Sequence, residues 1–232
     1  MNRKLSHKEK IEFYNFLCSF VTDNRKQRFE DVACKRTRFI TVVLEDIFQS
    51  HNASAVLRTC DCFGIQDVHI IENKNEYAVN PDVALGSSNW LTLHQYYKKN
   101  NNTEDCIKKL KKQGYSIIAS TPHKNDCLIE ELDISRKTAI MFGTEKDGLS
   151  DISIKHADSF VKIPMVGFTE SFNISVSAAI ALFSLTGRLR KSEVHWQLSE
   201  KELIDIKIEW VKNTVKKSEL LVKQYFQKLS KK

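Results

Sequence analysis

The chain has 232 residues, of which 41% are hydrophobic, so it can form a substantial core as one large domain or one domain with extensions. No apolar run is long enough to span a membrane and the first ten residues are polar, so we expect a cytoplasmic protein without a membrane anchor or signal peptide. The six cysteines do not show the paired spacing of a zinc site, which favours reduced thiols and no bound metal.

The net charge of +7 is unevenly distributed along the chain. Residues 1–38 contain ten Lys and Arg against five acidic residues, and residues 188–232 contain twelve against six. The intervening part contains fourteen against eighteen. This distribution favours a near-neutral body with two basic ends that bind a polyanion, although the solvated faces of Lys-rich amphipathic helices are the plainer alternative.

The first half of the chain predicts two helices followed by a strand–helix–strand unit. The amino-terminal helix follows a capping box at Ser6 and Glu9, and Asn52 or Ser54 is a candidate N-cap of the third helix. A strand, a helix and a second strand in succession imply a parallel pair. The predicted elements are helices near 6–20, 22–34 and 53–63 and strands at 39–44 and 67–71.

The second half continues the alternation of strands and helices. The predicted strands lie at 90–96, 115–120 and 138–142, and a helix lies at 103–113. From residue 138 to residue 183 the predicted order is a strand, a glycine loop, a short helix, a strand, a second loop and a long helix. A further long helix begins after Ser199. We therefore predict an α/β fold with a mostly parallel sheet and helices on both faces. Residues 39–190 would form this domain, with a basic helical extension at 1–38 and a basic helix at 191–232.

Two polar loops in the 138–183 stretch are candidates for a binding site. Gly143 and Gly148 have the spacing of a phosphate-binding loop, but Leu149 stands where that loop needs its lysine, which argues against a nucleoside triphosphatase. No G-x-G-x-x-G motif follows a strand, which argues against a dinucleotide site. The glycines could expose backbone amides to a ligand, or the loop could simply connect a strand to a helix.

Three segments of the chain together resemble the motifs of a known family. They are Asn52-x5-Arg58, Gly143-x-Glu145-x-x-Gly148, and Ile163-Pro-Met-x-Gly-x-x-x-Ser-x-Asn-x-Ser. In this order and spacing they are similar to the SpoU branch of the SPOUT RNA methyltransferases, most closely to the TrmH type, the tRNA guanosine-2′-O-methyltransferases. The resemblance covers roughly residues 36–190.

The resemblance implies a deep trefoil knot at about 138–190 and S-adenosyl-L-methionine as the cofactor. It also implies that the cofactor is bent within the knot loops, and that no metal is needed. Phe172 stands where the family often has Leu, which changes the local packing. The cofactor-binding residues implied are Thr121, Gly143, Gly148, Ile163, Met165, Phe172 and Asn173.

The resemblance also implies a catalytic group for methyl transfer to a ribose 2′-oxygen. Arg58 would be the central residue, acting either as a base or as a stabiliser of a phosphate and a developing alkoxide; a guanidinium keeps its proton at physiological pH, which makes the second role physically easier. Taken without the other motifs, Arg58 would be assigned to a surface or interface salt bridge. The full implied set is Arg58, Asn52, Glu145, Ser171 and Asn173.

The partners that the resemblance implies are tRNA and a second copy of the chain. The expected product is 2′-O-methylated guanosine 18 in the D-loop, with ribosomal RNA, another tRNA site, or a non-catalytic RNA-binding knot protein as alternatives. The small residues after Asn173 could pack a tight core or form the homodimer face of the knot region. The candidate tRNA-binding residues are Arg25, Arg28, Arg36, Arg38, Arg188 and Arg190.

Overall fold

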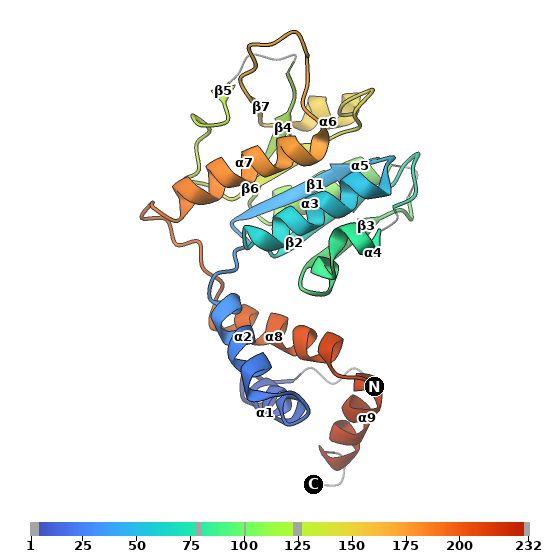
Figure 1. Cartoon of the computed structure of the whole chain (residues 1–232), viewed down its shortest axis with the longest axis vertical. Coiled ribbons are helices and arrows are strands. Elements are labelled where there is room, and N and C mark those ends of the chain that lie inside the picture. The colour runs from blue at the N-terminus through green and yellow to red at the C-terminus, as the bar shows by residue number, and fades with distance from the viewer. Residues whose placement is uncertain (1–4, 78–79, 100, 123–126, 230–232) are drawn as a thin grey trace. The chain divides into compact units, whose positions relative to one another are not determined.

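The computed structural model describes residues 5–77, 80–99, 101–122 and 127–229, which belong to two compact units (Figure 1). One unit is Thr37–Trp196 and the other combines Met1–Arg36 with Gln197–Lys232. The two ends of the chain, which the sequence suggested as separate extensions, therefore belong to one helical unit. None of the helices described is long and apolar enough to cross a membrane.

The larger unit is built on a seven-stranded sheet in the order β3-β2-β1-β6-β4-β7-β5. Every neighbouring pair is parallel. The strands are β1 (Ile40–Glu45), β2 (Asp67–Ile71), β3 (Thr92–Tyr96), β4 (Ser116–Ser120), β5 (Cys127–Leu128), β6 (Thr138–Phe142) and β7 (Ser159–Lys162). The predicted α/β class with a parallel sheet is confirmed.

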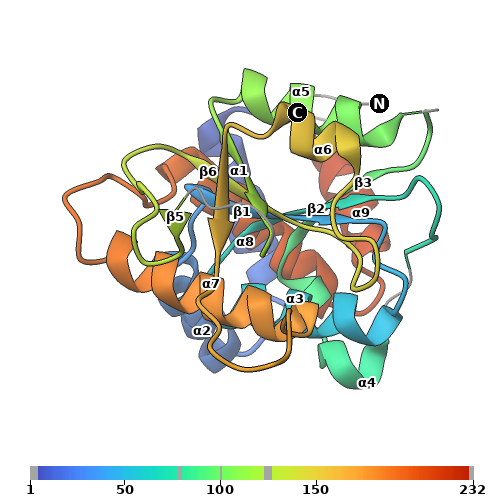
Figure 2. The ribbon, with the colours of Figure 1, turned by 90° about the horizontal axis from the view of Figure 1, so that it is seen from above.

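Helices cover both faces of this sheet, as Figure 2 shows. Helices α3 (Ser50–Cys62) and α7 (Ile174–Leu189) lie side by side on one face, and α5 (Asn102–Lys112) and α6 (Asp151–His156) lie on the other. A short helix α4 (Pro81–Ala84) and a 3₁₀ turn (Ser87–Asn89) lie within the long connection to β3. All six residues of β1 are buried because both faces of a parallel sheet are covered.

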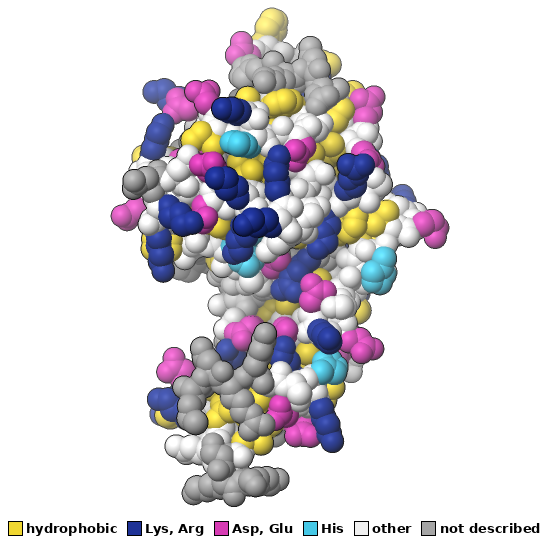
Figure 3. All heavy atoms as spheres, turned by 180° about the vertical axis from the view of Figure 1, so that it is seen from behind, with side chains coloured by type: hydrophobic (Ala, Val, Ile, Leu, Met, Phe, Trp, Pro, Cys, Tyr) yellow, Lys and Arg dark blue, Asp and Glu magenta, His cyan; other side chains and the backbone are white. Residues whose placement is uncertain are grey.

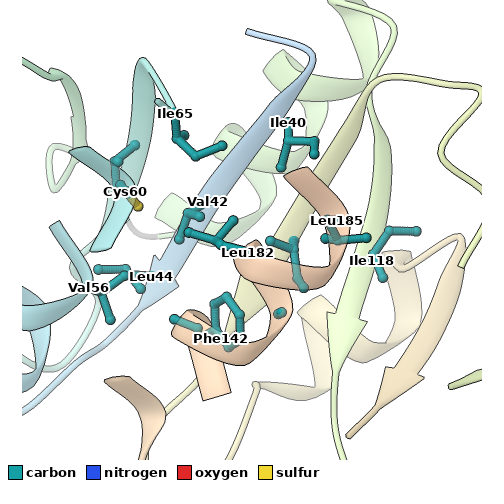
Figure 4. Close-up of a cluster of buried hydrophobic side chains, with 14 of the residues drawn as sticks. Ile40, Val42, Leu44, Val56, Cys60, Ile65, Ile118, Phe142, Leu182 and Leu185 are labelled. Carbon is teal, nitrogen blue, oxygen red and sulfur yellow. The ribbon is translucent and has the colours of Figure 1, made fainter. Parts of the chain in front are cut away.

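The core divides between the two faces because successive side chains of a strand point in opposite directions. Val42 and Leu44 of β1 belong to the cluster that contains Val56 of α3 and Leu182 of α7 (Figure 4). Val43, between them, belongs to the cluster with the apolar stripe of α5. The sheet is thus held by two separate apolar layers, and the pair α3–α7 is fixed against β1 and β6.

Helix α3 begins earlier than its sequence suggests. The helix starts at Ser50 with Gln49 as N-cap, and Asn52 and Ser54, the candidate caps, are buried inside its first turns. The backbone amide of Asn52 donates to the backbone carbonyl of Gln49 at 3.0 Å, so the first turn of the helix forms upstream of the predicted start. Asn52 therefore projects its side chain from within the helix.

The smaller unit consists of α1 (His7–Cys18), α2 (Asp23–Ala33), α8 (Glu200–Thr214) and α9 (Ser218–Leu229). Both predicted capping boxes form, one at Ser6 and the other at Ser199. The single carboxyl-terminal helix predicted from the sequence is wrong, because Val215 is extended and Lys217 adopts a φ of 58°, which ends α8 before α9 begins. Helix α8 packs on α1 and α2, so the ends of the chain share one core.

Candidate functional site

A pocket of about 340 Å³ lies beyond the carboxyl ends of β4 and β6. This edge is where open parallel sheets bind ligands, because the loops that follow neighbouring strands converge there. Three chain segments line the pocket, and they come from the loop after β4, the loop after β6 and the start of α7. The lining residues are 120–122, 142–149, Ile154, Ser171, Phe172, Ile174 and Ser177.

The loop after β6 is a tight turn closed on itself. The Thr144 amide donates to the Gly148 carbonyl at 2.9 Å, and the Gly148 amide donates to the Thr144 carbonyl at 3.1 Å. A Cβ atom added at Gly143 would lie 2.1 Å from the Gly148 carbonyl oxygen. Gly148 has a φ of 69°, in the left-handed region that favours glycine. Both glycines are thus required by the turn that forms one wall of the pocket.

Asn52, Glu145 and Asn173 form one hydrogen-bonded network beside this pocket. The Asn52 side-chain amide donates to Glu145 Oε1 at 2.9 Å, and the Asn173 side-chain amide donates to the same oxygen at 2.5 Å. The Asn173 amide also lies 3.1 Å from Asn52 Oδ1. The network joins the loops that follow β1, β6 and β7, so the three sequence motifs meet in space.

Asn173 has a second role as the N-cap of α7. Its Oδ1 atom accepts from the Ser175 amide at 2.8 Å and from the Ser175 hydroxyl at 2.5 Å. With Oδ1 occupied by the helix start, the Asn173 amide group is directed to Glu145 and Asn52. The start of α7 is therefore positioned by the same side chain that closes the network.

Arg58 is not part of this network. It follows Asn52 by six residues on α3, which corresponds to about 9 Å along the helix axis and about 120° around it. Its side chain is exposed and makes no hydrogen bond or ion pair with any residue in the described part of the chain. The interpretation of Arg58 as a salt-bridged surface residue is therefore unsupported within a single chain.

The predicted cofactor residues are partly brought together. Thr121, Gly143, Gly148 and Phe172 line the pocket, as does Ser171 from the catalytic set. Phe172 is 40% exposed, so its ring is available to a ligand or a partner. Ile163 and Met165 do not line the pocket; both are half-buried, and Ile163 packs against the core under α3 and α7.

Two acidic residues at the end of β1 hold neighbouring segments in place, and the sequence reasoning did not single them out. Glu45 is buried, and its carboxylate accepts from the Ser150 amide at 2.9 Å and from the Thr103 hydroxyl at 2.6 Å. Asp46 has a φ of 53° and accepts from the backbone amides of Asn73 and Lys74 at 2.6 and 2.8 Å. The available signal was an acidic pair, Glu45 and Asp46, at the carboxyl end of a mostly apolar strand.

A polar cluster at the β2–β3 edge of the sheet is separate from the pocket. The His69 and His94 rings stack at 4.5 Å, and Asp67 lies 3.6 Å from His94 and 2.9 Å from Arg38. Burial, together with the neighbouring His94, lowers the pKa of His69 to about 3. Burial would raise the pKa of Asp67, but the contacts with His94 and Arg38 lower it below its ordinary value.

The six arginines proposed to bind tRNA fall into different environments. The assignment of Arg36 is wrong: its side chain is 2% exposed and its guanidinium lies 5.3 Å from the centre of the Trp210 ring. Arg188 donates to the carbonyls of Ile129 and Leu132 at 2.9 and 2.8 Å, and so braces the segment after β5. The exposed members of the set are Arg25, Arg28 and Arg190, while Arg38 is half-buried in its ion pair with Asp67.

The larger unit also has a face rich in Lys and Arg, although the net charge of the unit is slightly negative. Figure 3 shows Lys and Arg side chains distributed over the face that α5 covers. Lys109 lies 5.4 Å from the centre of the Tyr96 ring, and Lys137 lies 5.3 Å from that of Tyr115. The exposed lysines of this face are Lys98, Lys108, Lys109, Lys111, Lys112 and Lys137. No group of His, Cys, Asp and Glu among the described residues is arranged to hold a metal ion.

Comparison with known proteins identifies the family. The model of the SpoU rRNA methylase family matches residues 39–183 of the chain, which contain all three motifs. The chain belongs to this family. The sequence resemblance to SpoU methyltransferases is thereby confirmed.

Individual SpoU relatives match over most of the chain. A tRNA (guanosine(18)-2′-O)-methyltransferase of Borreliella burgdorferi is 48% identical over 200 residues, which are 86% of this chain and 90% of that protein. The enzyme of the same name from Thermus thermophilus is 33% identical over 162 residues, covering 70% of this chain and 81% of that protein. The first of these matches, 200 residues of a 232-residue chain, is long enough to include all three motifs.

Solved structures share the fold of this SpoU protein. The TrmH/SpoU tRNA modifying enzyme of A. aeolicus superposes with a TM-score of 0.74 at 27% identity, covering 84% of this chain and 98% of that one. The SpoU methyltransferase AviRb from Streptomyces viridochromogenes, solved in complex with the cofactor AdoMet, superposes with a TM-score of 0.59 at 20% identity, covering 70% of this chain and 65% of that one. The second similarity supports the fold alone.

Proposed function

We propose that this chain transfers a methyl group from S-adenosyl-L-methionine to the 2′-oxygen of guanosine 18 in tRNA, and that it does so in the cytoplasm. The observation that carries the proposal is the meeting of the three SpoU motifs in one network, through Asn52, Glu145 and Asn173, beside a pocket of about 340 Å³. Its 48% identity to a tRNA (guanosine(18)-2′-O)-methyltransferase supports tRNA over ribosomal RNA as the substrate.

The pocket residues fit S-adenosyl-L-methionine. The turn from Gly143 to Gly148 lines one side of the pocket and leaves no room for a side chain at Gly143, and Phe172 and Ile174 add apolar surface. When bound, the cofactor supplies an electrophilic methyl group on a sulfonium. Thr121, Gly143, Gly148, Ser171 and Phe172 would hold it, in the trefoil knot that the family resemblance implies at about 138–190.

The chain's own contribution is to position the ribose and to favour the ionised form of its 2′-hydroxyl. The carboxylate of Glu145 is held by two amide groups, so it can fix the loops around the pocket and present its other oxygen to the ribose. A guanidinium is a poor proton acceptor, so we assign Arg58 to binding a phosphate and stabilising the developing alkoxide rather than to removing a proton. Ser171, exposed at the pocket wall, completes the set.

We also propose that the active form is a homodimer in which Arg58 serves the pocket of the second protomer. Arg58 is exposed outside the network of its own chain, and the neighbouring helix α7 exposes Val176 and Phe183, the latter by 71%. Ala178 and Ala181 do not contribute to this surface, since they are buried in the core cluster of the larger unit. The small residues of α7 therefore explain packing within one chain, and its exposed apolar residues supply the proposed interface.

Tritiated S-adenosyl-L-methionine and an unmodified tRNA transcript test the activity. Nuclease digestion and nucleoside analysis should place the label in 2′-O-methylguanosine from the D-loop, and a transcript with adenosine at position 18 should take up little or none. Arg58→Ala should abolish transfer while S-adenosylhomocysteine still binds. Label in ribosomal RNA instead, or full turnover by the Arg58→Ala variant, would refute the assignment.

Mixing two inactive variants tests the shared site. If Arg58 serves the partner's pocket, a mixed dimer of the Arg58→Ala and Asn173→Ala chains contains one intact site. Mixing equal amounts after subunit exchange should then restore about a quarter of wild-type activity, since half of the dimers are mixed and each has one working site. Activity that stays at the level of the separate variants would place Arg58 in the site of its own chain.

A further inference from the structure

The helical unit contains a larger pocket, of about 720 Å³, which is within the range of small-molecule binding sites. It lies where the end of α1, the start of α2 and the α8–α9 junction come together. None of its lining residues belongs to the three SpoU motifs. They are Phe20, Val21, Thr22, Arg25, Thr214, Val215, Lys216, Lys217, Leu220, Leu221 and Gln224.

An exposed aromatic ring forms part of the pocket wall. Phe20 is 49% exposed, and its ring lies 5.5 Å from that of Phe16 in an edge-on arrangement. Phe16 in turn lies 5.1 Å from Tyr225 of α9, so the row of rings runs from the unit's interior to the pocket. Because Phe16 supports one side of Phe20, the ring can be held in place with part of its surface open to a ligand.

The other side of the pocket is cationic. Arg25, Lys216 and Lys217 line it, and no acidic residue is among the lining residues of the described chain. Elsewhere in the unit, Lys10 and Lys207 pair with Asp205 and Glu30. Three cations beside an open aromatic ring are complementary to a ligand that has both an anionic group and a flat, weakly polar ring.

We propose that this pocket binds one unstacked nucleotide of the substrate RNA, with its base on Phe20 and its flanking phosphates on Arg25, Lys216 and Lys217. Proteins recognise single-stranded RNA through stacking on aromatic side chains combined with cations along the backbone. The proposal rests on the proposed function for the RNA nature of the substrate. It adds a second site, made only of residues of the helical unit, so this unit recognises an unpaired nucleotide in addition to phosphate charge.

Binding of the full-length protein to an unmodified tRNA transcript tests the stacking. Phe20→Ala should weaken tRNA affinity about 5- to 150-fold, the range expected for loss of one base–aromatic contact. Phe20→Trp should stay within about threefold of wild type because it keeps a stacking surface. Phe20→Leu should resemble Phe20→Ala. If the leucine variant binds as tightly as wild type, the contact is merely apolar and the proposal fails.

The salt dependence of binding tests the cations. The variant with Gln at Arg25, Lys216 and Lys217 should lower the slope of log affinity against log salt by about two, as expected when three phosphate contacts to a single strand are lost. A control with Gln at Lys8, Lys35 and Lys201, which are exposed in the same unit but do not line the pocket, should change the slope less. Equal changes in both variants would mean diffuse attraction and would overturn the pocket assignment.

The two proposals can fail separately. If wild type forms 2′-O-methylguanosine while Phe20→Ala, verified as folded by its thermal unfolding, binds tRNA as tightly as wild type, the pocket proposal fails and the methyltransferase proposal stands. If wild type transfers no methyl group but Phe20→Ala and Phe20→Leu still lose RNA affinity, the pocket proposal stands alone. Tight binding of a poly-glutamate peptide that displaces the tRNA would assign the pocket to an acidic protein segment instead.

Discussion

Substitution of Gly143 by Ala should weaken cofactor binding more than a Gly→Ala substitution elsewhere in the loops around the pocket. The new Cβ would lie 2.1 Å from the Gly148 carbonyl oxygen and 2.4 Å from the Leu149 nitrogen. Real Cβ atoms do not approach other heavy atoms closer than 3.0 Å, so the turn must open by roughly 1 Å. That movement disrupts the two backbone hydrogen bonds between Thr144 and Gly148.

The size of the effect follows from those two bonds. Each contributes about 0.5–1.5 kcal/mol net, so opening the turn costs about 1–3 kcal/mol, similar to the cost of overpacking a core by one methyl group. If the cofactor binds only the closed turn, the same free energy is subtracted from binding. The dissociation constant for S-adenosylhomocysteine should therefore rise about 5- to 150-fold.

Titration calorimetry with S-adenosylhomocysteine measures this change, and two other glycines serve as controls. A Cβ at Gly148 meets nothing within 4 Å, but its φ of 69° would strain an alanine by about 1–2 kcal/mol. A Cβ at Gly167 also meets open space, without a left-handed φ, and should have no effect. The expected order of damage is Gly143, Gly148, Gly167. Equal affinities for the Gly143→Ala and Gly167→Ala variants would refute the steric reasoning.

Two further predictions concern stability. The pKa of His69 is lowered from 6.5 to about 3 in the folded protein. As the pH falls below 6.5, His69 is therefore protonated in the unfolded chain but not in the folded one. The stability that neutral His69 contributes is complete above pH 6.5 and is lost as the pH falls toward 3. The free energy of unfolding should fall by up to about 1.4 kcal/mol per pH unit in that window, and His69→Gln should flatten the slope measured in urea titrations; an unchanged slope would contradict the assignment. Glu45→Ala should lower the free energy of unfolding by about 2–4 kcal/mol, because it leaves the Ser150 amide and the Thr103 hydroxyl without their acceptor, and a loss below about 0.5 kcal/mol would show that water replaces the carboxylate.

The sequence predicted the parts of the structure that depend on local pattern. The continuous apolar run of β1 required a strand covered on both faces, and the glycines at 143 and 148 matched a turn that tolerates no side chain at the first position. The sequence analysis grouped Asn52, Glu145 and Asn173 in one site only because of the family resemblance. Nothing in the local pattern indicates that three residues separated by up to 121 positions share hydrogen bonds.

The failures arise where tertiary packing overrides local chemistry. Arg36 lies in a run of basic residues that indicates a solvated or RNA-binding segment, yet it is buried against Trp210, which lies far away in the chain. A guanidinium stacked on an aromatic face can be buried at modest cost, and no count of charges reveals it. The α8–α9 break was missed for a similar reason, since the apolar stripe continues through Val215 and only its extended conformation ends the helix.

The hydrogen-bonded network of Asn52, Glu145 and Asn173 depends on the packing of helices α3 and α7. Asn52 lies in the first turns of α3 and Asn173 caps α7, so the separation of their side chains depends on how closely these two helices pack. Ala178 and Ala181 are buried in the shared cluster, where small side chains let helix axes approach. The alanines of α7, which suggested an interface, instead belong to the core packing that supports both helices, and this packing brings Asn52 and Asn173 within reach of one oxygen of Glu145. Because α7 also presents Phe183 to solvent, the same helix links the geometry of the pocket to the surface on which a second protomer would dock.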